Sequence, residues 1–207
     1  MSPKPHEYVF RAYSGTETME LTWWLTETGP VDYLEDWEKT KSGISTYWSQ
    51  FWQSGGAIDF SGSTDPRAHE LERRVVLSQY LTAIQFAGDF PPSESGLTLS
   101  SWYQKHHTEM IWWHAAHFAL WGRDEFLANN LKWYVGRLPI ARELARSRGL
   151  IGARWAKMIG PDGRESSGGN PLIVWNQPHP IHLAELLYRN SPTPAMLARY
   201  RDLVLET

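Results

Sequence analysis

The sequence predicts a mainly α protein with a short β segment at its N-terminus, and three observations support this fold class. Apolar and polar residues alternate with a period of two between Glu7 and Leu25, which is typical of half-buried strands. After the break at Gly29-Pro30 the apolar periodicity becomes helical. Further along, Pro follows a capping residue at two positions and Gly closes several apolar runs, as expected at helix ends.

The helices are expected one after another along the rest of the chain. Asp65-Pro66 starts one of them, with a capping Asp and with Pro at the first helical position, and Thr193-Pro194 starts the last. The apolar pattern of this last helix still runs at Leu205 without a stop signal, so we expect the chain to be cut inside an element. The expected helical segments are part of 33–52, then 65–88, 110–121, 124–134, 138–148, 181–188 and a segment from 193 onward.

Two long segments between the helices carry no clear periodicity. Residues 89–101 are rich in Pro, Ser and Gly, and residues 149–178 are polar and rich in Gly. A loop as long as 149–178 inside a compact domain is usually functional or a sign of misassigned elements. The second of them carries side chains suited to ligand binding, which are Trp155, Lys157, Glu165, Trp175 and Gln177.

Composition excludes several classes of protein. The chain has 207 residues, enough for one full domain with a substantial core. Its 20 Lys and Arg against 23 Asp and Glu, with no basic run, argue against a nucleic-acid partner. The absence of Cys excludes disulfides, thiolate nucleophiles and Cys-based zinc sites. The sequence contains no apolar run of about 18 residues, so no membrane span is predicted. The sequence does not distinguish between cytoplasm and periplasm, because a cysteine-free chain without a signal segment suits both equally.

The twelve Trp residues are the most informative part of the composition. Such a load is common in proteins that stack their rings on flat amphipathic ligands, above all sugars. The alternative is a core built from large rings.

One segment, residues 102–117, contains four of the eight His residues. Within it Lys105, His107 and Glu109 are spaced by two, so in an extended chain they point to the same side. A carboxylate beside Lys and His can hold a sugar hydroxyl or orient a water molecule, and Trp112 or Trp113 can supply a stacking face. The alternative is a solvated loop whose Trp residues belong to a helix core.

A metal site is not expected. His114 and His117 lie three apart on one helix face, with His107 and Glu109 upstream, but this spacing matches no common ligand signature and His-Glu-x-x-His is absent. We expect His117, beside Ala116 and Phe118, to be a core histidine. Neither a phosphate-binding loop nor a Gly-x-Ser-x-Gly setting occurs, so no cofactor and no Ser nucleophile are predicted.

Several motifs in the same order resemble the six-hairpin glycosidases, most closely the catalytic domain of glycoside hydrolase family 65 and its relatives. The resemblance covers roughly residues 33–205. The motifs that carry it are Tyr47–Trp52, Glu70–Leu81, Trp102–His117, Leu138–Arg142 and Gly149–Trp155.

The resemblance implies a β-domain, a linker helix and an (α/α)6 barrel of helical hairpins whose loops form a sugar pocket at one end. By this comparison residues 1–29 would be the end of the β-domain, 30–60 the linker helix region, and 61–207 the first part of the barrel. The family's Phe-Trp-Asp segment would fall on Trp112, Trp113 and His114, with His in place of Asp. The related inverting α-fucosidases of family 95 place polar residues where Lys105 and His107 stand.

These comparisons imply a carbohydrate-active protein that cleaves a glycosidic bond with paired carboxylates if the barrel is complete. Counting the acids in the pocket loops selects Glu109 and Glu165 as the catalytic pair, although the family's general acid belongs to a later loop with no matching position. An alternative is a carbohydrate-binding or partner-dependent helical module without catalysis. We expect an oligosaccharide or glycoside as ligand, no nucleic acid, no membrane, and self-association through exposed barrel helices. The expected substrate-binding residues are Lys105, His107, Trp112, Trp113, His114, Trp155, Lys157, Trp175, Gln177 and His179.

Overall fold

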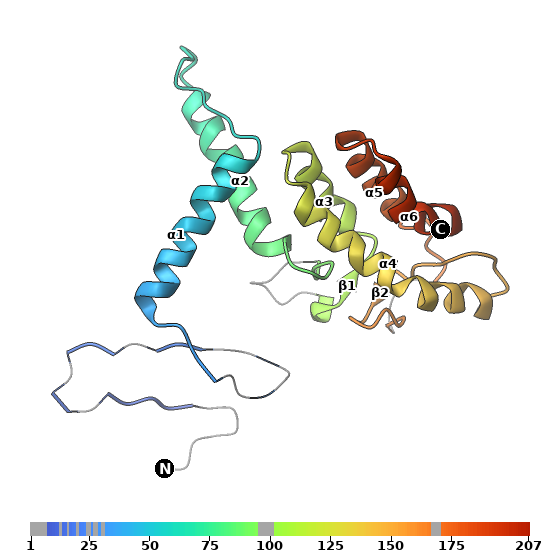
Figure 1. The fold of residues 1–207 in the computed structure, drawn as a ribbon, viewed down its shortest axis with the longest axis horizontal. Coiled ribbons are helices and arrows are strands. Elements are labelled where there is room, and N and C mark those ends of the chain that lie inside the picture. The colour runs from blue at the N-terminus through green and yellow to red at the C-terminus, as the bar shows by residue number, and fades with distance from the viewer. Residues whose placement is uncertain are drawn as a thin grey trace. The chain divides into compact units, whose positions relative to one another are not determined.

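The protein is mainly helical and divides into two compact units, Met1–Gln53 and Ser54–Thr207 (Figure 1). The boundary falls inside the 30–60 range that was expected to hold a linker helix. The computed structural model describes residues 8–12, 14–15, 17–19, 21–23, 26, 29, 32–94, 102–166 and 171–207.

The first unit does not contain the expected strands among its described residues. From 8 to 26 these residues lie in loops and turns, although Phe10 and Trp23 do meet, with ring centroids 5.0 Å apart. Two strands alone are rarely stable without a third strand or a helix to cover them. This explains why the alternating apolar and polar residues do not form paired strands in the described part of this unit. Helix α1 (Trp37–Ser54) follows, as expected, and its rings Trp48, Phe51 and Trp52 pack in edge-to-face pairs.

The second unit carries the remaining elements. Helix α6 begins where the sequence predicts, because the Thr193 hydroxyl accepts a hydrogen bond from the Met196 backbone N–H at 3.2 Å. Helix α2 begins three residues after Asp65, whose carboxylate binds the Arg67 backbone N–H at 2.8 Å. The elements of this unit are α2 (Ala68–Phe86), the 3-10 turn η1 (Trp102–Gln104), β1 (His106–His107), α3 (Ile111–Leu120), α4 (Asp124–Ser147), β2 (Met158–Ile159), α5 (Pro178–Asn190) and α6 (Pro194–Glu206).

Helix α4 replaces the two helices expected over 124–134 and 138–148, so that prediction is wrong. Pro139 lies inside one continuous helix of 24 residues. The buried positions Leu131, Tyr134, Leu138 and Ala141 recur every three or four residues through this region, so one apolar stripe faces the core without interruption. Packing along that stripe outweighs the cost of an interior proline, which is about 3 kcal/mol.

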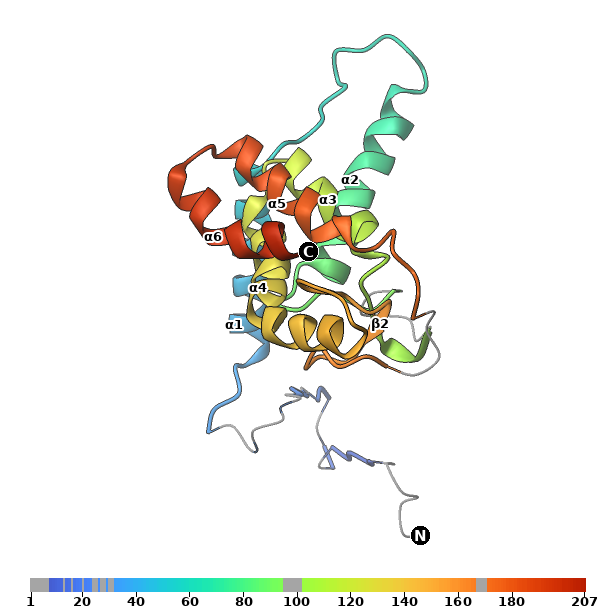
Figure 2. The ribbon, with the colours of Figure 1, turned by 90° about the vertical axis from the view of Figure 1, so that its right-hand side faces the viewer.

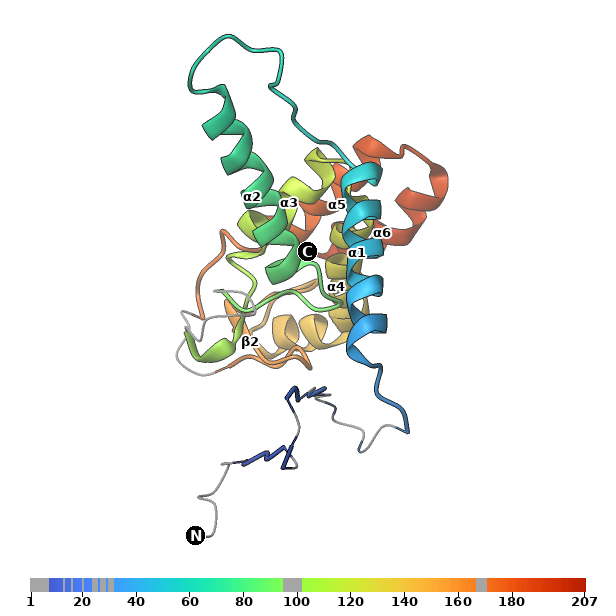
Figure 3. The same ribbon diagram turned by 90° about the vertical axis from the view of Figure 1, so that its left-hand side faces the viewer.

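The core of the second unit forms where α3, α4 and α5 pack together (Figure 2). Phe118, Leu127, Leu131 and Leu183 are fully buried there. Short turns join α3 to α4 and α5 to α6, and each pair packs as a hairpin, while α2 lies against α3 (Figure 3). Within the described ranges no helix has the length and apolar character needed to cross a membrane.

A small antiparallel sheet shapes the loops at one end of the helices. His106 pairs with Ile159 and His107 with Met158, so residues 158 and 159 of the long loop lie against the start of the 106–109 segment. An isolated bridge from Ser93 to His106 adds the loop that follows α2. Three segments that are distant in sequence therefore meet at β1.

Candidate functional site

Glu109 lies at the centre of a charged cluster beside β1. The Lys157 Nζ is 3.0 Å from Glu109 Oε1, and His107 Nδ1 is 3.5 Å from the same oxygen. Lys157 immediately precedes β2, so the β1–β2 pairing brings the cation to the carboxylate. Glu109 is largely buried, and the ion pair compensates the charge that burial would otherwise penalise.

A second carboxylate, that of Glu94, reaches the same imidazole. Its Oε2 lies 3.3 Å from His107 Nδ1. Because both carboxylates touch one nitrogen atom, their contacting oxygens are at most about 7 Å apart, which is close to the separation of carboxyl pairs in glycosidases. The sequence analysis did not select Glu94, since a Pro- and Ser-rich loop gives no signal that one of its acids will fold inward.

His107 is a neutral bridge between these two acids. Its side chain is 1% exposed, and burial lowers its pKa more than the neighbouring Glu94 and Glu109 raise it, with Lys157 lowering it further. The ring is therefore uncharged near neutral pH. A neutral imidazole can donate to one carboxylate without adding a cation to the cluster.

An exposed tryptophan covers one side of the cluster. The Trp102 ring centroid lies 5.7 Å from that of His107, and Lys157 Nζ is 5.7 Å from the Trp102 centroid. This places Trp102 in the range of a cation–π contact with the ion-paired lysine.

A second group of rings lies at the beginning of α3 and α5. Trp113, which is 53% exposed, and Trp175, which is 44% exposed, have ring centroids 5.5 Å apart, and the His179 ring lies 5.4 Å from Trp175. Trp112 continues the group, with its centroid 5.6 Å from that of Trp113. Two large exposed rings at one place form a surface on which a flat ligand can stack.

Thr108 and His179 join the ring group to the charged cluster. The His179 Nδ1 is 3.1 Å from the Thr108 carbonyl oxygen, directly before Glu109, and Glu109 acts electrostatically on His179. Burial is the main cause that lowers the pKa of His179, so this ring is also neutral near pH 7. We name the whole arrangement the Glu109 site, which consists of Glu94, Trp102, His107, Glu109, Trp113, Lys157, Trp175 and His179.

A buried network of hydrogen bonds connects the segments that carry the site. The Asn176 side chain is fully buried, and its Nδ2 donates to Thr108 Oγ1 at 2.7 Å and to the Trp155 carbonyl at 3.0 Å. Gln177 donates from Nε2 to the same carbonyl and to Asn176 Oδ1, and accepts from the Trp155 N–H through Oε1. The sequence analysis missed Asn176 and Thr108, because nothing in their local pattern indicates pairing across 68 positions.

Two residues expected to bind substrate belong to this support instead. Trp155 is 3% exposed, its ring packs on Tyr134 with centroids 4.7 Å apart, and its indole N–H donates to Thr207 Oγ1. The Gln177 amide is engaged by the Trp155 backbone and by Asn176. Both side chains therefore make contacts inside the protein, where they support the loops of the site.

His114 lies in the core between α2 and α3, and not at the surface as a sugar contact. It stacks on Phe86 with ring centroids 4.3 Å apart and an interplanar angle of 6°. Burial lowers the pKa of His114 to about 4, against a hydrogen bond to the Glu94 backbone that raises it.

The remaining expected residues are only partly gathered at the site. Lys105 lies half-buried just before β1. The cation that contacts Glu109 is Lys157, whereas the residue spacing had led us to expect Lys105 there. Glu165 forms an ion pair with Arg148 at 2.6 Å, so Glu94 and not Glu165 is the acid that shares an imidazole with Glu109. No cluster of metal-ligating side chains is present among the residues with described positions.

Comparison with known proteins adds no relative. No protein-family model, curated protein or solved structure matches the chain. A functional conclusion therefore depends on the chemistry of the Glu109 site.

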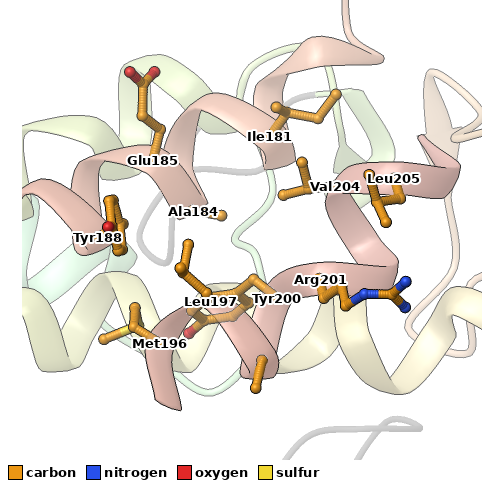
Figure 4. A pocket seen from close by; sticks show the side chains of 11 residues that line it. Ile181, Ala184, Glu185, Tyr188, Met196, Leu197, Tyr200, Arg201, Val204 and Leu205 are labelled. Carbon is orange, nitrogen blue, oxygen red and sulfur yellow. The ribbon is translucent and has the colours of Figure 1, made fainter. Parts of the chain in front are cut away.

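An apolar groove of about 460 Å³ lies between α5 and α6, and none of the Glu109 site residues lines it (Figure 4). Leu197 and Leu205 contribute large exposed side chains to it. Its lining is almost entirely hydrophobic, with Glu185 and Arg201 as the charged exceptions.

Proposed function

We propose that the chain is a carbohydrate-binding protein and that the Glu109 site holds a sugar. The observation that carries the proposal is the combination of exposed Trp113 and Trp175 rings with a carboxylate already fixed by Lys157. The α3–α4 and α5–α6 hairpins are compatible with part of an (α/α)6 barrel, the architecture that we propose for these helices.

The two parts of the site match the two faces of a sugar. A pyranose ring has an apolar face of C–H groups that stacks on tryptophan, and an edge of hydroxyls that needs charged or polar partners. The Glu109 carboxylate accepts hydrogen bonds from sugar hydroxyls, and the Lys157 ammonium donates hydrogen bonds to sugar oxygens. Because the network around Asn176 holds both parts, little ordering is needed when ligand binds.

Hydrolysis of a glycosidic bond is the second candidate, favoured by the short separation between Glu94 and Glu109. Two carboxyl groups on opposite sides of a scissile bond are the usual requirement. However, the buried His107 ring touches both acids, so the space between these oxygens is occupied by an imidazole. Binding without turnover is therefore the function that the geometry supports best.

Tryptophan fluorescence during titration with oligosaccharides tests the proposal. Trp113→Ala and Trp175→Ala should each weaken binding by about 5- to 150-fold, because one stacked ring contributes roughly 1 to 3 kcal/mol. Trp37→Ala is the matched control, since Trp37 is equally exposed but lies outside the site. Release of nitrophenol from aryl glycosides, lost in both Glu94→Gln and Glu109→Gln, would instead establish hydrolysis.

A further inference from the structure

Gln79 of α2 is a buried amide that has nothing to bind within the described structure. Its side chain is 5% exposed, and neither Nε2 nor Oε1 has a hydrogen-bond partner. Leaving both ends of an amide unpaired is costly, and such groups in native proteins usually meet water or a ligand.

Gln79 is one of the residues that line a pocket of about 290 Å³ in the second unit. Ser78 and Thr82 accompany Gln79 from α2, while His117 and Trp121 come from the end of α3. Two polar groups of the lining have partners: the Thr82 hydroxyl donates to the Ser78 carbonyl, and His117 Nε2 is 3.0 Å from the His114 carbonyl. The Gln79 amide, in contrast, is buried without a partner in the described structure.

Arg74, the one charged residue among the described residues that line the pocket, is already ion-paired, which favours a neutral ligand. Its Nε lies 2.8 Å from Oε1 of Glu70, a carboxylate that Arg73 also contacts. Burial is the main cause that lowers the pKa of His117, so its ring is neutral near pH 7.

An amide presents one acceptor beside two donors, so its best complement is a pair of adjacent groups that can both donate and accept. Neighbouring hydroxyls on a sugar ring do this, and the Trp121 and His117 rings offer flat surfaces beside the amide. The volume is at the lower end of ligand pockets, which span about 300 to 1,000 Å³, and suits one small ring. We infer that the Gln79 pocket is a second carbohydrate site, which binds one neutral monosaccharide ring through two neighbouring hydroxyls.

Nuclear magnetic resonance of the full chain labelled with ¹⁵N tests this inference. The side-chain NH2 signal of Gln79 is assigned by its absence in Gln79→Met and followed during titration with D-glucose, D-galactose and L-fucose. We expect at least one of these sugars to move that signal, and the Trp121 indole signal, in a saturable way. Gln79→Met should abolish the Trp121 shift, whereas Gln85→Met, on the same helix but outside the pocket lining, should keep it.

Thermal unfolding supplies a second readout. Saturating sugar should raise the melting temperature of Trp113→Ala, in which the Glu109 site is impaired, and leave that of the double variant Trp113→Ala/Gln79→Met unchanged, because a ligand stabilises only the state that binds it. If none of the three sugars moves the Gln79 signal, the inference is wrong and the amide is simply hydrated. A shift with acetamide but with no sugar would equally overturn it.

The wild-type titration decides the question even if Gln79→Met does not fold, since the side-chain signal can also be assigned through its connection to the assigned backbone of Gln79. The outcome is separable from that at the Glu109 site. Trp113→Ala removes binding there but should not alter the Gln79 titration, and Gln79→Met should not alter the response of Trp113.

Discussion

Replacing Asn176 by Leu is expected to lower the free energy of unfolding by about 2 to 4 kcal/mol. The side chains have similar volume, so the main loss is polar. Asn176 makes three hydrogen bonds, to Thr108 Oγ1, to the Trp155 carbonyl and from Gln177 Nε2, at 2.7, 3.0 and 2.9 Å. Each such bond contributes roughly 0.5 to 1.5 kcal/mol net.

The loss stays within this range because each partner keeps another contact. Thr108 still donates to the Ala156 carbonyl, and Gln177 still donates to the Trp155 carbonyl. Urea unfolding followed by circular dichroism measures the change as a shift in midpoint at constant slope. Asn129→Leu, at a partly exposed position of α4, is the control and should change stability by no more than about 0.5 kcal/mol. A loss below about 1 kcal/mol for Asn176→Leu would show that this network does not hold the loops together.

Three further predictions concern the helices and the buried histidines. Pro139→Ala should raise the free energy of unfolding by about 1 to 3 kcal/mol in urea, because an exposed proline inside α4 removes one backbone hydrogen bond; an unchanged midpoint would indicate two helices. Burial lowers the pKa of His106 to about 3 and that of His114 to about 4, so the unfolded state binds more protons below about pH 6.5 and stability should fall from there down to about pH 3. In His114→Gln the free energy of unfolding should fall less steeply with decreasing pH above about pH 4. Denaturation curves that give the same pH dependence for the variant and the wild type would contradict this prediction. The apolar α5–α6 groove should drive self-association at micromolar concentrations, and Leu197→Glu should reverse it in analytical ultracentrifugation; a monomeric wild type would refute this.

The helices were largely predictable from the sequence because their signals are local. The Thr193 cap and the buried spacing on α4 are both visible over a few residues, and α1, α2, α3, α5 and α6 overlap the expected segments. The break expected before Pro139 failed because tertiary packing outweighs a local penalty, which a window of sequence cannot weigh.

The candidate site was predictable only in part because it depends on pairing between distant segments. His107 and Glu109 were placed together from their spacing, and they do meet. The cation beside them is Lys157, brought by the β1–β2 register, and the second acid is Glu94, brought by the bridge from Ser93 to His106. Two-residue strands leave no periodic pattern from which such a register could be read.

Calorimetric titration of an oligosaccharide into matched glutamine variants tests the carbohydrate proposal most directly. Glu109→Gln removes the charged acceptor of the site, whereas Glu165→Gln removes a carboxylate that pairs with Arg148. We predict that the first variant binds at least about tenfold more weakly than the wild type, since a hydrogen bond to a charged group contributes roughly 1.5 to 3 kcal/mol, and that the second binds as tightly as the wild type. Equal affinity in both variants, or no binding by the wild type across the oligosaccharide panel, would contradict the proposal.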